Sequence, residues 1–263
     1  MHGIRAVVLG CTILLGLCVS SWANEAPSIA AASNIKFALD EVAQQFTQDT
    51  GLKVRISYGS SGNFVAQIRH GAPFELFLSA DEKYIYQLHK LGVTTSDGTL
   101  YAIGRLAVAA PTTSPLALDE NLVGLNALMM QGNLKRFAIA NPDHAPYGER
   151  AKELLQKLGL WTQIEPQLIY GENVSQAAQF ALSGSTQGGI VALSLAMAPQ
   201  FQAIAHYVAL PSDLHAPINQ RMVLTDKAGD TAVRFYDYLQ QEKARQIFTE
   251  FGFGLPPHLA AGE

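Results

Sequence analysis

The stretch that decides the fold is residues 141–150, NPDHAPYGER. The mainly apolar run at 136–140 precedes it and is typical of a short buried strand. Behind it, apolar residues recur at helical spacing: Ala151, Leu154, Leu155 and Leu158. We therefore predict a strand-to-helix turn, whose path is fixed by prolines and in which Gly148 leaves the backbone exposed. A helix start of this kind presents free N–H groups and the positive end of the helix dipole, which favour an anion.

Turns of this kind follow predicted strands at four places. They are residues 33–34 (SN), 60–63 (SSGN), 145–148 (APYG) and 171–175 (GENVS). Because the carboxyl ends of parallel strands meet at one edge of a sheet, we expect the four turns to face one cleft. Lys and Arg are nearly absent from them, so an anion bound there would be held by neutral donors and helix ends. Arg150, just after the third turn, is expected to be a solvated helix residue.

Each candidate residue also has an ordinary structural explanation. Ser33, Asn34 and Ser61 are residue types that commonly cap helices. Tyr147 can simply pack at a lobe surface, and Val174 stands where a helix buries its first apolar side chain. For any one turn the ordinary explanation is the better one, but four such turns in one exported chain favour a ligand site.

The order of predicted elements is β-α-β-α-β-α, then a strand at 106–110, then a second βα series from about residue 124, and a returning strand at 221–225. This order predicts an α/β fold with two lobes, each a mostly parallel sheet flanked by helices. The chain is expected to cross between lobes near Gly104 and at 211–217, with the ligand between the lobes. The predicted division is 24–104 for the first part of lobe 1, 105–212 for lobe 2, and 213–263 for the return to lobe 1.

Residues 1–23 have the pattern of a secretory signal peptide: an apolar segment at 6–19, then Ser-Trp-Ala as a cleavage signal. We expect cleavage after Ala23. The rival interpretation is lipid attachment at Cys18, but Leu17 stands where the bacterial lipoprotein signal requires a small residue.

The chain has 263 residues and two cysteines, Cys11 and Cys18, both inside this segment. An exported mature chain without disulfides suits the bacterial periplasm and must be stabilised by its core. Cleavage removes one basic residue, Arg5, and no acidic one, which changes the net charge from −4 to −5. No basic stripe indicates nucleic-acid binding.

Five segments, in order along the chain, resemble the periplasmic molybdate-binding proteins of ABC importers. They are 30–33 (AAAS), 59–61 (GSS), 75–81 (ELFLSAD), 141–148 (NPDHAPYG) and 171–174 (GENV), with further likeness at 235–239 and 251–253. The resemblance implies a two-lobed periplasmic binding protein, joined by two crossing strands, that closes around an oxyanion. It implies capture without catalysis, no cofactor, delivery to an importer's membrane permease subunits, and a monomer.

The resemblance also implies a ligand set for molybdate or tungstate. The hydroxyls and amides of two serines and the backbone N–H groups of two further residues would donate: Ser33, Ser61, Tyr147 and Val174. Some family members add a tyrosine hydroxyl at the position of Ala192, so that donor is missing here. Asn34 is expected to replace it, as in another branch of the family. Molybdenum would be bound only as molybdate, through these same residues and with no direct cation ligands.

Three alternatives remain from the residues. The site could prefer another tetrahedral oxyanion, such as sulfate or phosphate. An exported serine hydrolase is a second alternative, but residues 59–62 lack the spacing of a Gly-x-Ser-x-Gly elbow. A metal-ion binder is a third, but the seven histidines are dispersed and include no His-x-x-x-His pair.

Overall fold

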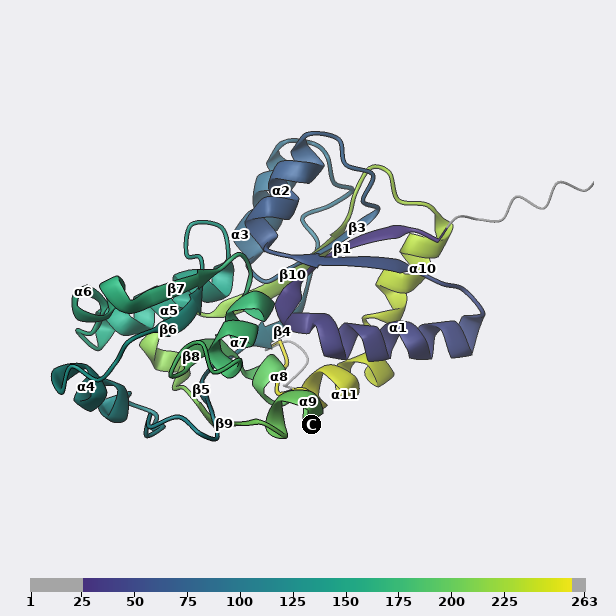
Figure 1. Ribbon diagram of the computed structural model, residues 1–263. Helices are drawn as coiled ribbons and strands as arrows, with labels where there is room; N and C mark the ends of the chain where they lie inside the picture. The colour runs from purple at the N-terminus through teal and green to yellow at the C-terminus, as the bar shows by residue number, and fades with distance from the viewer. Residues whose placement is uncertain (1–25, 257–263) are drawn as a thin grey trace, which may run out of the picture.

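The computed structural model describes residues 26–256, arranged as two lobes that lie side by side (Figure 1). The predicted signal peptide, the cleavage site at Ala23 and the lipid-attachment alternative at Cys18 lie outside the described residues. None of the helices within residues 26–256 is long and apolar enough to cross a membrane.

Each lobe contains one five-stranded sheet. In lobe 1 the order is β2-β1-β3-β10-β4, with β1 (Ser28–Ala32), β2 (Arg55–Gly59), β3 (Leu76–Ser79), β4 (Thr99–Gly104) and β10 (Ile218–Leu224). In lobe 2 the order is β7-β6-β8-β5-β9, with β5 (Leu106–Pro111), β6 (Phe137–Ala140), β7 (Leu168–Gly171), β8 (Gly189–Ala192) and β9 (Ala205–Ala209).

Both sheets are mixed in the same way. β10 runs antiparallel to β3 and β4, and β5 runs antiparallel to β8 and β9, while β1, β2 and β3 are mutually parallel, as are β6, β7 and β8. The reversed strand in each lobe adjoins a crossing. β4 of lobe 1 is followed after one residue, Arg105, by β5 of lobe 2, and the chain returns between β9 and β10 through η3 (Ser212–Leu214).

Helices cover both faces of the lobe 1 sheet, because successive strand residues point to opposite faces. Leu76 and Leu78 pack in the cluster that contains the buried side of α1, whereas Phe77 packs in a second cluster with α2 and α3. The first face carries α1 (Lys36–Thr50), α10 (Asp230–Tyr238) and α11 (Glu242–Glu250); the second carries α2 (Ser61–Arg69) and α3 (Glu82–Lys90).

Lobe 2 has one hydrophobic core that includes the fully buried Phe137 and Ile139 of β6. Around its sheet lie α4 (Val123–Met130), α5 (Pro146–Lys157), α6 (Trp161–Ile164), η2 (Glu165–Gln167), α7 (Val174–Leu182), α8 (Leu193–Ala196) and α9 (Pro199–Gln202). The short η1 (Ser33–Ile35) of lobe 1 contacts α7 and α8 of lobe 2.

The turn at 141–150 leads from β6 into α5, as predicted. The helix begins at Pro146, because proline is well suited to the first helical position. Its buried face is formed at the predicted spacing by Ala151, Leu154 and Leu155. After α5, Gly159 adopts a positive φ of 72°, a left-handed conformation that commonly ends a helix.

Candidate functional site

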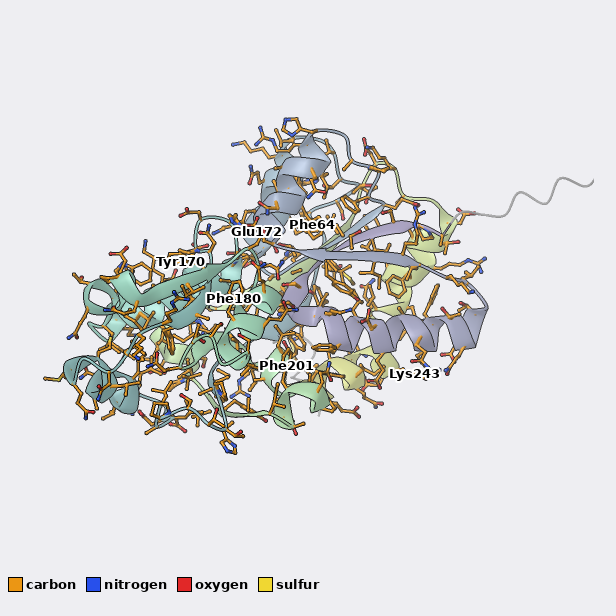
Figure 2. All side chains as sticks on the ribbon, in the orientation of Figure 1. Phe64, Tyr170, Glu172, Phe180, Phe201 and Lys243 are labelled. Atoms are coloured by element: carbon orange, nitrogen blue, oxygen red, sulfur yellow. The ribbon has the colours of Figure 1, made fainter. Side chains whose placement is uncertain are left out.

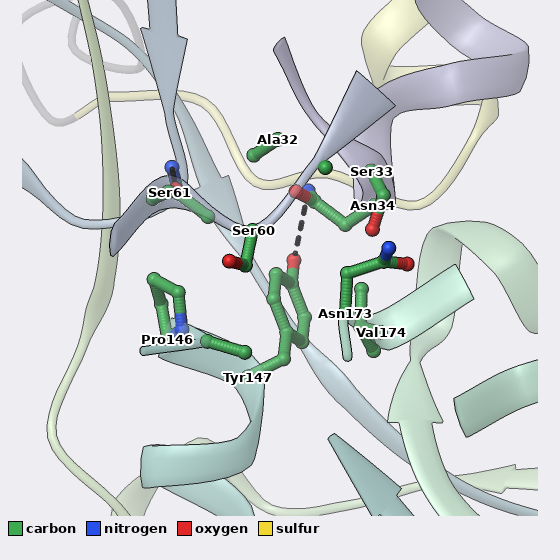
Figure 3. Close-up of a pocket in the computed structure, with 12 residues that line it drawn as sticks. Ala32, Ser33, Asn34, Ser60, Ser61, Pro146, Tyr147, Asn173 and Val174 are labelled. Atoms are coloured by element: carbon green, nitrogen blue, oxygen red, sulfur yellow. Dashed lines mark hydrogen bonds between the residues drawn. The ribbon is translucent and has the colours of Figure 1, made fainter. Parts of the chain in front are cut away.

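A cavity between the lobes contains all five residues proposed from the sequence (Figure 3). The space left inside it is only about 10 Å³, far less than the roughly 300–1,000 Å³ of pockets for drug-sized ligands. It is lined by Ala32, Ser33, Asn34, Gly59, Ser60, Ser61, Ala80, Ala145, Pro146, Tyr147, Asn173 and Val174. The cavity therefore suits a small solute.

The four predicted turns, two from each lobe, supply this lining apart from Ala32, Gly59 and Ala80. They follow β1, β2, β6 and β7, at the carboxyl ends of parallel strands. Ser61, Tyr147 and Val174 lie in the first turns of α2, α5 and α7, where an N–H group has no intrahelical acceptor. Among the described residues none of these three backbone N–H groups donates to an acceptor elsewhere in the chain. They are free donors beside the cavity.

The two proposed serine hydroxyls are already held as acceptors. The backbone N–H of Ala80 donates to Ser61 Oγ at 3.0 Å, and the N–H of Ser175 donates to Ser33 Oγ at 3.3 Å. No acceptor for either hydroxyl proton is recorded within residues 26–256. Because a hydroxyl carries one donor, both protons remain available to a guest in the cavity.

The ordinary helix-cap explanation is wrong for the proposed residues. Asn34 and Ser33 lie within η1, and α1 has no side-chain cap at its start. The cap of α2 is Ser60, whose Oγ accepts from Asn63 N–H at 3.4 Å, and not Ser61. Asn173, in contrast, does cap α7.

A buried polar network adjoins the cavity and contains a residue that the sequence did not single out. Asn34 Nδ2 donates to the Tyr147 hydroxyl at 3.2 Å and to Gln220 Oε1 at 2.9 Å. Gln220 lies on β10, is completely buried, and also donates from Nε2 to the Tyr147 hydroxyl at 3.3 Å. Burial raises the pKa of the Tyr147 hydroxyl, so it stays protonated at neutral pH.

No charged side chain lines the cavity within the described part of the chain. Arg150 is nearby, but the prediction that it is solvated is wrong. Its side chain is 11% exposed and pairs with Asp81 of lobe 1 at 3.0 Å and with Glu153 of its own helix. Arg150 therefore neutralises carboxylates between the lobes, and its charge is not available to the cavity.

The lobes are closed over the cavity. Across the interface, Gly62 N–H donates to the backbone oxygen of His144 at 3.0 Å, and Asn63 Nδ2 donates to Glu172 Oε1 at 2.6 Å. Figure 2 places Glu172 at the boundary between the lobes, near α2. The five proposed residues are at most 4% exposed, so a solute can reach them only if the lobes separate.

A serine and a histidine meet at this interface, which bears on the hydrolase alternative. Ser60 Oγ lies 3.0 Å from His144 Nδ1, and His144 Nε2 lies 3.7 Å from Glu172 Oε2. The second distance is too long for a hydrogen bond that would orient a catalytic base. Ser60 also caps α2, and Glu172 is largely exposed. The geometry is that of a contact between lobes.

A comparison with known families decides the classification. The profile described as bacterial extracellular solute-binding protein matches residues 27–254. The chain belongs to this family. As a solute-binding protein it is expected to bind and not to catalyse, so the prediction that it is not an enzyme is confirmed.

This solute-binding protein has curated relatives of nearly the same length. It is 36% identical to the molybdate-binding protein ModA of Azotobacter vinelandii over 230 aligned residues. The alignment covers 86% of this chain and 89% of that protein. It is 35% identical to ModA of Rhodobacter capsulatus over 254 aligned residues, and this alignment covers 95% of this chain and 96% of that protein. The resemblance inferred from the motifs is confirmed.

A solved structure supports the same classification. The periplasmic molybdate-binding protein of A. vinelandii matches this solute-binding protein with a TM-score of 0.79 and 30% identity, over 88% of this chain and 99% of that one. Together with the two mixed sheets, this match confirms the predicted two-lobed α/β fold.

Proposed function

We propose that this protein captures molybdate outside the cytoplasm and delivers it to the permease subunits of an ABC importer. The observation that carries the proposal is the convergence of uncharged donors from both lobes on one small closed cavity. The names of the relatives and of the matching structure support molybdate as the solute. Tungstate, an oxyanion of the same shape and charge, is proposed as a second ligand.

The proposed ligand set is the one expected from the sequence. The hydroxyls of Ser33 and Ser61 and the backbone N–H groups of Tyr147 and Val174 donate to the oxyanion, with Asn34 as a further donor. Each helix start carries roughly half a positive unit charge. The three helix starts of α2, α5 and α7 can therefore offset most of the charge of a dianion without a basic side chain.

The transport cycle follows from the burial of the site. The free protein opens about its two crossings, a tetrahedral dianion enters, and the lobes close to the arrangement described above. We propose export by residues 1–23 as a signal peptide, residence in the periplasm as a monomer, and lobe boundaries at 24–104, 105–212 and 213–263. The closed form, with its two lobes fixed in one relation, is the form that the permease recognises.

The first test is calorimetric titration of the purified mature protein with molybdate, and with tungstate, sulfate and phosphate as competitors. Tight binding of molybdate that a large excess of sulfate or phosphate does not displace is the expected result. Preferential binding of sulfate or phosphate would replace molybdate with that oxyanion as the natural ligand. The absence of binding to all four would overturn the proposed function.

Ser61→Ala is expected to weaken molybdate binding more than tenfold. The change removes one hydrogen bond to a charged ligand, which contributes about 1.5–3 kcal/mol. Calorimetry on the variant and the unchanged protein measures the difference. Ser114→Ala is the control, because Ser114 Oγ, like Ser61 Oγ, accepts from a backbone N–H, that of Leu116 at 3.2 Å, but lies outside the cavity lining. Equal affinities for Ser61→Ala and the unchanged protein would remove Ser61 from the ligand set.

A further inference from the structure

Asn34 is the one cavity-lining residue in the described chain with a buried, unpartnered side-chain polar atom. Its Oδ1 accepts no hydrogen bond, whereas both hydrogens of its Nδ2 are used, by the Tyr147 hydroxyl and by Gln220 Oε1. A buried acceptor without a donor is unfavourable. In this arrangement the Asn34 side chain also has no hydrogen left to donate to an anion.

Gln220 holds Asn34 in this arrangement, although it does not itself line the cavity. Its Oε1 accepts from Asn34 Nδ2 at 2.9 Å and from the Tyr101 hydroxyl at 3.1 Å, while its Nε2 donates to the Tyr147 hydroxyl at 3.3 Å. Gln220 lies on β10 next to a β-bulge, in the reversed strand of lobe 1. One side chain thus contacts Asn34 of lobe 1 and Tyr147 of lobe 2.

The same heavy-atom positions allow a second set of hydrogen bonds, because an amide turned by 180° exchanges its oxygen and nitrogen. If both amides turn, Gln220 Nε2 donates to Asn34 Oδ1 and to the Tyr101 hydroxyl. The Tyr147 hydroxyl, which has one proton, then donates it to Gln220 Oε1, which takes the former place of Nε2 at 3.3 Å. Asn34 Nδ2 takes the place of the unpartnered oxygen, where a bound oxyanion can accept its hydrogen.

We propose that Gln220 is a positioning residue that determines whether Asn34 presents a donor or an acceptor to the ligand. Binding of the oxyanion turns the two amides together, and Gln220 then holds Asn34 Oδ1 away from the anion. This inference rests on the proposed oxyanion site and names the residue that makes Asn34 a donor there. It also makes the site selective. In the turned arrangement Asn34 presents a hydrogen-bond donor, which repels a solute whose oxygen carries a proton at that point.

The sharpest test is Gln220→Glu, measured by molybdate titration over a range of pH beside the unchanged protein. An ionised carboxylate can only accept, so it keeps Asn34 Nδ2 turned toward itself and Oδ1 toward the ligand. We expect affinity to fall about tenfold or more at neutral pH. As pH falls and the introduced carboxyl gains a proton, it can donate and accept as an amide does, so affinity relative to the unchanged protein should recover. A purely structural role would give no such recovery.

A double-mutant cycle provides the second readout. Gln220→Met should lower molybdate affinity about tenfold in the unchanged background but have little further effect in Asn34→Ala, because Gln220 acts through Asn34. Gln246→Met, on the exposed face of α11, is the matched control and should bind as the unchanged protein does. Circular dichroism checks that each variant is folded. If Gln220→Met does not fold, the Gln220→Glu titrations alone test the positioning role.

The outcomes separate this inference from the proposed function. If the unchanged protein does not bind molybdate, the proposed function fails. If it binds, but Gln220→Glu loses no affinity at neutral pH or shows a loss that low pH does not reverse, the positioning role is wrong. Equal effects of Gln220→Met with and without Asn34 would overturn it as well.

Discussion

Gly62→Val is expected to reduce molybdate affinity by about a hundredfold or more while leaving lobe 1 folded. A Cβ at Gly62 would lie 2.8 Å from the backbone oxygen of His144 and 2.9 Å from its Cβ, both in lobe 2. Such a clash typically costs 1–3 kcal/mol for small additions, and the branched valine side chain adds two further carbons. The steric clash exists only when the lobes are closed, so the stability of the open protein is largely unaffected.

Titration calorimetry measures the loss of affinity, and small-angle scattering shows whether added molybdate still compacts the molecule. Gly229→Ala is a matched glycine substitution, because the added Cβ would meet only the Glu75 carboxylate, at 3.3 Å, away from the cavity. It should bind normally. Unaltered affinity of Gly62→Val would mean that ligand binding does not require the closed arrangement.

Gly148→Ala is expected to lower the free energy of unfolding by about 3 kcal/mol. A Cβ there would lie 2.2 Å from the backbone oxygen of Ala140, at the end of β6, and neither backbone segment can yield easily. The start of α5 would have to move away from the sheet, and the Tyr147 N–H would move with it. For a chain of this size the melting temperature should fall by roughly 6–12 °C.

Thermal unfolding followed by circular dichroism measures this effect, with Gly229→Ala again as the control. Molybdate binding should weaken in the same variant, since one of the proposed donors is displaced. An unchanged melting temperature would show that the turn tolerates a side chain and that close packing of α5 on β6 is not what requires glycine.

The predictions that succeeded from sequence were those fixed by local patterns. The strand before residue 141 and the helix after it were found because apolar spacing reports burial along one element. The meeting of the four turns followed from a general rule for parallel sheets. The returning strand was predicted at 221–225 but begins at Ile218, and β4 was not predicted at all, since both depend on pairing between distant segments.

The errors have a common physical cause. The helix-cap alternative for Asn34 rested on its residue type, but its side chain donates to Tyr147 and Gln220, which are distant in sequence. Arg150 was expected in solvent because isolated helix arginines usually are, but Asp81 of the other lobe approaches it. Gln220 has no local signal, because its role depends on the register that places β10 beside β4.

The nesting of lobe 2 within lobe 1 has a consequence for how the molecule is assembled. All five strands of lobe 2 lie between Leu106 and Ala209, so this unit is complete in one uninterrupted piece of chain. In the other unit, β10 is the only strand beside β4 within residues 26–256, and β10 follows the whole of lobe 2 in the chain. The inserted unit can therefore fold first, and the outer one is completed only when the segment that follows lobe 2 adds β10 to its sheet.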